Sequence, residues 1–260
     1  MVSQSAIIGL VFQMIISIIL PVAGYILLRK KYRIAFRPVL IGILIFFVFS
    51  NVLGGAVNQF ILVTNESTSA IVDQPILFAI YGGLSAGFFE EMGRFIAFAW
   101  VLKMYQERKD GLAYGLGHGG VEALLIGTLG SIQLISLALL QNSGRLEETM
   151  GASLPPEVIQ QLTGALTGLT FPVAFMGGLE RAAAFFIQIA LSLLVLYAVK
   201  NKKYGWIFGA ILIHALIDFF PGLYQAGMVN LITAEIVVYG IGIGAFVFIK
   251  KSRQLKGLGE

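Results

Sequence analysis

Long apolar stretches follow one another along the chain, separated by short polar connections. Seven such stretches lie at residues 6–28, 38–63, 76–104, 111–140, 171–199, 206–227 and 229–249. A helix needs about 20 mostly apolar residues to cross the hydrocarbon core of a bilayer. The pattern therefore predicts an all-α fold, a polytopic membrane helix bundle with about seven transmembrane helices. We find no internal repeat or low-complexity linker, so we expect a single integral membrane domain over residues 1–260.

Composition agrees with a membrane protein and excludes several other classes. The 260 residues are 57% hydrophobic and only 12% charged, a balance that soluble domains do not show. The chain has no cysteine, which excludes a disulfide framework and a thiolate nucleophile or metal ligand. A net charge of +4 does not indicate nucleic-acid binding here, because the basic residues lie in short clusters between apolar stretches. We expect the lipid bilayer as a partner and no nucleic acid.

The basic clusters predict the orientation in the cell membrane. Fifteen of the 18 Lys and Arg residues fall within residues 29–37, 103–109, 200–203 and 250–256. All four clusters lie on one side of a seven-helix topology, and the positive-inside rule assigns that side to the cytoplasm. We therefore expect a multi-pass protein with its N-terminus outside and its C-terminus cytoplasmic. The outer loop 141–170 would carry an amphipathic helix over residues 155–169, where apolar residues recur at helical spacing.

Ten ionisable side chains fall inside the apolar stretches. They are Glu90, Glu91, Arg94, His118, Glu122, Glu180, Arg181, His214, Asp218 and Glu235. Each costs about 2.5–3.5 kcal/mol at the centre of a bilayer, so they must face a paired or hydrated interior. One explanation is structural, because polar residues commonly join helices in membranes.

Spacing favours a functional explanation for three pairs. Residues four apart share one face of a helix, and this spacing separates Glu90 from Arg94, His118 from Glu122, and His214 from Asp218. At a rise of about 1.5 Å per residue, the second member of each pair lies roughly 15–18 Å from the cytoplasmic end of its helix. We therefore predict one catalytic-type cluster, within residues 76–227, in a cavity open to water near mid-membrane.

The remaining charges of the spans have weaker claims. In the fifth predicted helix, Gln188 reaches the depth of the cluster, whereas Glu180 and Arg181 lie in the outer half and form an ion-paired wall. His118, Gln188, Glu180 and Arg181 are expected to support the cluster. Glu235 lies near the outer interface, where we expect its carboxylate to stay in water.

Four motifs carry a resemblance to a known family. They are Glu90-Glu91-x-x-Arg94, Gly117-His118-Gly119-Gly120-x-Glu122, Gly177-Gly178-Leu179-Glu180-Arg181 and His214-Ala-Leu-Ile-Asp218. The chain resembles the YhfC family of bacterial intramembrane proteases from its third helix to its sixth. It is also similar to the PrsW proteases, and more distantly to the CAAX prenyl endopeptidase and bacteriocin-processing superfamily. In the CAAX group, the arginine follows one residue later and a histidine takes the place of Glu122.

The resemblance implies hydrolysis of a peptide bond in a membrane-embedded protein or peptide by glutamate-activated water. The catalytic residues would be Glu90, Glu91, Arg94, Glu122, His214 and Asp218. Glu90 or Glu91 would take the proton of the water, and His214 would orient the water or stabilise the oxyanion. Asp218 would fix the tautomer of His214. This glutamic-type mechanism needs no cofactor and no metal.

Three alternatives remain open from the sequence. The first is a zinc-dependent intramembrane metalloprotease, whose metal would be held by His118, Glu122, His214 and Asp218. The HExxH signature of many zinc proteases is absent from the chain. The second is a non-catalytic membrane binding or immunity protein, and the third is a proton-coupled carrier that uses the same charges as a relay.

Overall fold

The protein is helical throughout the part that the structure describes. The computed structural model describes residues 1–254 and 257–258, so Lys256 of the last basic cluster lies outside the described residues. Within that range there are α-, π- and 3₁₀-helices and no strand, which confirms the all-α prediction.

The helices keep the order of the predicted stretches. They are α1 (Gln4–Tyr32), α2 (Phe36–Ile45), the π-helical η1 (Phe46–Gly54), α3 (Gly55–Gln59), the π-helical η2 (Phe60–Thr64), α4 (Glu66–Val72), α5 (Pro75–Ile96), the π-helical η3 (Ala97–Val101), α6 (Arg108–Glu122), the π-helical η4 (Ala123–Leu129), α7 (Gly130–Asn142), α8 (Leu146–Met150), α9 (Pro156–Gly168), α10 (Phe171–Lys200), α11 (Gly205–Gln225), α12 (Leu231–Lys251) and the 3₁₀-helical η5 (Ser252–Gln254). Several of them run into one another to form longer spans.

Six spans among the described residues are long and apolar enough to cross a membrane. They cover Gln4–Tyr32, Phe36–Thr64, Arg108–Asn142, Phe171–Lys200, Gly205–Gln225 and Leu231–Gln254. Glu66–Val72 and Pro75–Val101, which are bent by 107° at a short break, give a seventh when the pair is counted as one broken span. The break precedes Pro75, since the residue before a proline is disfavoured in a helix. These spans confirm a multi-pass membrane protein of about seven helices.

The chain divides into two compact units that are interleaved in sequence. Unit 1 contains residues 1–20 and 122–182, and unit 2 contains residues 21–121 and 183–260. Helices α1 and α10 therefore each contribute to both units, as does the long span that begins with α6.

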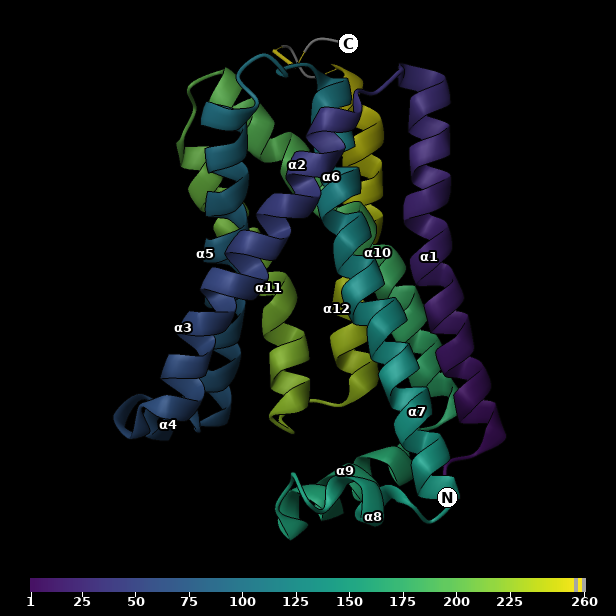
Figure 1. Cartoon of the computed structure of the whole chain (residues 1–260). Helices are drawn as coiled ribbons and strands as arrows, with labels where there is room; N and C mark the ends of the chain where they lie inside the picture. Colours follow the sequence, from purple (N-terminus) through teal and green to yellow (C-terminus); the bar gives the residue numbers. More distant parts are fainter. Residues whose placement is uncertain (255–256, 259–260) are drawn as a thin grey trace. The chain divides into compact units, whose positions relative to one another are not determined.

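Glycines on α5 allow α11 to pack closely beside it in unit 2 (Figure 1). A methyl group on Gly87 would lie 2.7 Å from the carbonyl oxygen of Ile211 and 3.4 Å from Cβ of His214. Gly83 approaches the carbonyl of Ala215 in the same way. Since small residues let membrane helices approach closely, this side of α5 brings Glu90 and its neighbours to His214.

The fourth span reaches its neighbours in unit 2 through glycines as well. A methyl group on Gly117 would collide with the carbonyl oxygen of Val39 on α2, and one on Gly119 would lie 2.9 Å from Cβ of Gln188 on α10. His118 lies between these two glycines and is fully buried. The sequence motif around His118 is therefore explained first by close helix packing.

Three of the four basic clusters meet at one end of unit 2. Arg108 donates to Oγ of Ser252 at 2.8 Å and to the carbonyl of Ile249 at 2.7 Å. Arg253 donates to the hydroxyl of Tyr32, at the end of α1. These contacts support the prediction that the clusters lie on one side of the membrane, and the assignment of that side to the cytoplasm stays a prediction.

In unit 1, the loop 141–170 contains the predicted amphipathic helix as α9, preceded by the short α8. Leu166 of α9 and Leu146 of α8 are buried in one cluster with Val2 and Ala138. The side chain of Asn142 accepts from the amide of Val2 at 2.7 Å and donates to its carbonyl at 2.9 Å. The start of the chain is thereby fixed to the end of α7.

Candidate active site

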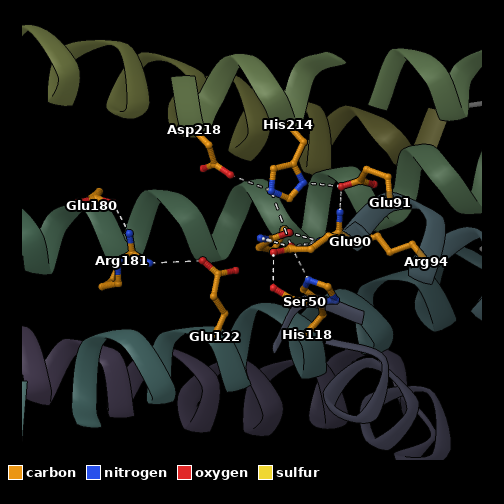
Figure 2. A network of polar contacts seen from close by, with 11 residues as sticks. Ser50, Glu90, Glu91, Arg94, His118, Glu122, Glu180, Arg181, His214 and Asp218 are labelled. Atoms are coloured by element: carbon orange, nitrogen blue, oxygen red, sulfur yellow. Dashed lines mark hydrogen bonds and ion pairs between the residues drawn. The ribbon is translucent and has the colours of Figure 1, made fainter. Parts of the chain in front are cut away.

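Glu90 is at the centre of a buried polar network in unit 2 (Figure 2). Its Oε2 atom lies 2.9 Å from Nε2 of His118 and accepts from Nε2 of Gln188 at 3.1 Å. Its Oε1 atom accepts from the hydroxyl of Ser50 at 3.2 Å. Three other spans therefore contribute side chains around one carboxylate.

His214 meets carboxylates through both of its ring nitrogens. Its Nδ1 atom lies 2.7 Å from Oε1 of Glu91. Its Nε2 atom lies 3.4 Å from Oδ2 of Asp218 and 3.7 Å from Oε2 of Glu90. An ionised carboxylate can only accept a hydrogen bond, so the contact with Glu91 puts a proton on Nδ1. In the neutral ring, Nε2 then presents a lone pair to two carboxylates, which is unfavourable unless a proton or a metal cation lies between them.

Arg94 supplies the positive charge of the network. It is fully buried, forms an ion pair with Glu91 and donates to Oε1 of Gln188. Its Nη2 atom lies 3.7 Å from Oε2 of Glu90. The predicted pairing of Glu90 with Arg94 is present, and the closer ion pair is the one with Glu91.

The network has more negative than positive charge when its histidines are neutral. Glu90, Glu91 and Asp218 contribute three carboxylates, and Arg94 contributes one guanidinium. An uncompensated charge in the protein interior is strongly destabilising. Two protonated histidines or one divalent cation would balance the excess.

A second polar network lies in unit 1. Arg181 forms an ion pair with Glu180 and lies 3.4 Å from Oε1 of Glu122. The three side chains are between 11% and 26% exposed, in contrast to the fully buried Arg94. The predicted pairing of Glu180 with Arg181 is confirmed. Glu122 pairs with Arg181, and its expected place beside the catalytic water stays a prediction.

Glu235 and Ser50 lie in surroundings that the sequence did not predict. Glu235 was expected to stay in water near the outer interface, and this is wrong, because the residue is only 4% exposed. Sequence reasoning also missed Ser50, which donates to Glu90. The available signal was the polar pair Ser50 and Asn51, which with Asn58 and Gln59 interrupts the apolar stretch 38–63.

The donor set of unit 2 suits a metal ion such as zinc. Atoms that share a tetrahedral zinc at about 2.0–2.1 Å lie roughly 3.3 Å from one another. The separations of Glu90 from the two Nε2 atoms, 2.9 Å to His118 and 3.7 Å to His214, bracket that value. Asp218, at 3.4 Å from Nε2 of His214, fits it as well. Hydrogen bonding from the other nitrogen of a ligating histidine to a carboxylate is typical of metal sites, and Glu91 takes that position. The ligands expected from the sequence were His118, Glu122, His214 and Asp218. The geometry adds Glu90 to these candidates.

Comparisons with known proteins agree with a membrane protein. The family model for the YhfC intramembrane metalloprotease matches residues 16–239. The chain is 38% identical over 256 residues to the uncharacterized membrane protein YhfC of Bacillus subtilis (strain 168), which covers 98% of this chain and 99% of the relative. No solved structure matches significantly. The chain belongs to the YhfC intramembrane metalloprotease family.

Proposed function

We propose that the protein is a metal-dependent intramembrane peptidase whose active site is the network around Glu90. The observation that supports this most is the convergence of the Nε2 atoms of His118 and His214 on one oxygen of Glu90. The description of the family as metalloproteases favours this mechanism over the metal-free glutamic type that we expected from the sequence. It also favours hydrolysis over binding, immunity or transport.

His118, His214 and Glu90 would hold the metal. Two histidines and one glutamate form a common catalytic zinc set, which leaves one position for water. A bound zinc would lower the pKa of water and polarise the scissile carbonyl. Glu91 accepts from Nδ1 of His214 and so keeps Nε2 available for the metal. Arg94 holds Glu91 in that position through their ion pair.

Asp218 is the best-placed general base. Its Oδ2 atom lies 3.4 Å from Nε2 of His214, beside the proposed ligands. Its side chain is 38% exposed, whereas those of Glu90 and Glu91 are buried and already bound to other groups. Asp218 can therefore meet a water molecule, accept its proton and later protonate the leaving amine.

The substrate would be a membrane protein or peptide. All residues of the proposed site lie in helices that form membrane spans, so a scissile bond must enter the bilayer to reach them. The substrate helix has to unwind around this bond before a water molecule can attack it.

Removal of the metal tests this proposal. The purified protein is placed in lipid nanodiscs with a fluorescent transmembrane peptide as substrate, and cleavage is followed in phenanthroline. We expect cleavage to stop and to return after addition of one equivalent of zinc, with no recovery on addition of magnesium. Undiminished cleavage by protein that contains no metal would favour the glutamic-type mechanism instead.

A further inference from the structure

The span Phe36–Thr64 faces α5 with residues spaced four apart. Ser50 donates to Glu90, and a methyl group on Gly54 would lie 3.3 Å from the ring of Phe89. Asn58 accepts from the hydroxyl of Tyr81 at 2.7 Å and from that of Ser85 at 2.8 Å. The span alternates between α and π winding over this range, and π-helical turns are frequent at functional sites.

Asn51, Gly55 and Gln59 directly follow Ser50, Gly54 and Asn58, and they form a second row along the same span. Asn51 and Gln59 are exposed, and Gly55 lies between them with no atom within 4 Å of the position of a Cβ. In the part of the chain that the structure describes, the Asn51 side chain has no hydrogen bond. Because Asn51 follows Ser50, this open row lies beside the residue that touches Glu90.

An exposed carboxamide in the middle of a membrane span requires a polar partner. Asn51 lies near the centre of the 29-residue span, and burial of an amide without a hydrogen bond costs roughly 1–3 kcal/mol on mutational scales. A carboxamide offers two donors and one acceptor, which is the complement of a peptide backbone. Free backbone groups are found at membrane depth only where protein or water satisfies them.

We propose that Asn51 and the open surface at Gly55 bind the unwound backbone of a substrate's transmembrane segment next to the active site. The proposal rests on the proposed function, because only a peptidase needs a locally unwound segment there. Asn51 satisfies backbone groups that unwinding exposes, and Gly55 leaves room for the main chain. Asn58 lies one turn after Gly54, in the row that faces α5. The hydroxyls of Tyr81 and Ser85 donate to its side-chain oxygen and so fix its orientation.

Two labelled peptides test the proposal. One is a continuous helix of about 20 leucines, and the other carries a Gly-Pro break at its centre. Their binding is measured by fluorescence anisotropy in nanodiscs, with every protein in a Glu90→Gln background to prevent turnover. We expect tighter binding of the broken peptide, and we expect Asn51→Leu to reduce this preference about threefold, the effect of one hydrogen bond between membrane segments.

Gly55→Leu provides a steric test. It enters open space, so the fold should be retained, and it should abolish the preference for the broken peptide. Gly240→Leu is the matched control, because Gly240 on α12 is equally open, and it should change nothing. Peptide preference that survives both Asn51→Leu and Gly55→Leu would overturn the proposal. A change from dimer to monomer in these variants, measured by light scattering, would overturn it as well by identifying a second copy as the occupant.

Zinc content separates this proposal from the proposed function. Asn51→Leu, with Glu90 intact, should bind zinc as the wild-type protein does, since Asn51 is not a ligand. If Asn51→Leu binds zinc normally and keeps the full peptide preference, the docking surface is contradicted and the proposed function is not. Absence of zinc from the wild-type protein would count against the metal site, whatever the peptides do.

Discussion

Two networks of buried charge, one in each unit, differ in what surrounds them. In unit 1, Arg181 lies between Glu180 and Glu122, and all three side chains remain partly exposed. In unit 2, Arg94 and Glu91 are completely buried and the side chain of Glu90 is 7% exposed. Partly exposed charges can be stabilised by water, whereas fully buried ones must be balanced by their neighbours. Carboxylates outnumber the guanidinium in both networks, but only in unit 2 do two buried glutamates face one buried arginine, so a cation or protons are needed there.

The positions of the two histidines also distinguish the two networks. Both histidines of the chain lie in the network of unit 2, and each points Nε2 at Glu90. The network of unit 1 consists of an arginine and two glutamates, which can form a structural ion pair without further chemistry. The catalytic role that we propose for the network of unit 2, and a structural role for the network of unit 1, follow from this difference.

Removal of a histidine should have the largest effect. In His214→Ala, a proposed zinc ligand is lost, and metal affinity should fall by more than the 10–100-fold typical for groups that only support a ligand. Zinc content, measured by mass spectrometry after dialysis, checks this. Arg181→Met is the control in the other network and should retain its zinc. Equal metal content in the two variants would remove the basis for distinguishing the networks.

Asp218→Asn should slow turnover strongly and leave the metal in place. Asparagine keeps the shape of the side chain and removes its basicity, so cleavage should slow by about 10²–10⁴-fold. Metal content and cleavage rate are measured on the same preparation. Glu90→Gln should lose the metal as well as activity. If instead Asp218→Asn loses zinc and Glu90→Gln keeps it, the roles of ligand and base are exchanged.

Arg181→Met should produce the smallest change. Contacts between polar side chains in membrane proteins contribute about 0.6 kcal/mol on average, and these side chains are partly exposed. We expect a modest fall in melting temperature and a cleavage rate close to that of the wild-type protein. Loss of cleavage with retained zinc would assign Arg181 to the active site and contradict the structural role.

Hydropathy and spacing were sufficient to predict much of this molecule. The spans follow from uninterrupted apolar stretches, and the four-residue spacings correctly indicated that Glu90, Arg94, His214 and Asp218 would meet. The bend before Pro75 was not predicted, because α4 is short and its sequence resembles a loop. Glu122 has the same spacing from His118 that Asp218 has from His214, but its ion pair with Arg181 could not be predicted from that spacing. Spacing along one helix does not determine which side chains of other helices a residue meets.

Finer details of the site depend on packing that the sequence does not encode locally. Asp218 was expected to fix the tautomer of His214, but Glu91 makes the contact with Nδ1 and Asp218 faces Nε2. This arrangement depends on how far α5 and α11 approach each other, which Gly87 permits. The contact of Ser50 with Glu90 depends in the same way on the π-helical winding of η1.

X-ray absorption at the zinc edge, on purified protein in nanodiscs, tests the central claim most directly. We predict one zinc per chain, bound by nitrogen and oxygen atoms at about 2.0–2.2 Å with the scattering pattern of two imidazoles. Sulfur ligation from cysteine is excluded, because the chain contains none. His214→Ala should remove the two-imidazole pattern. Protein that cleaves a transmembrane peptide while holding far less than one zinc or other metal ion per chain would contradict the account.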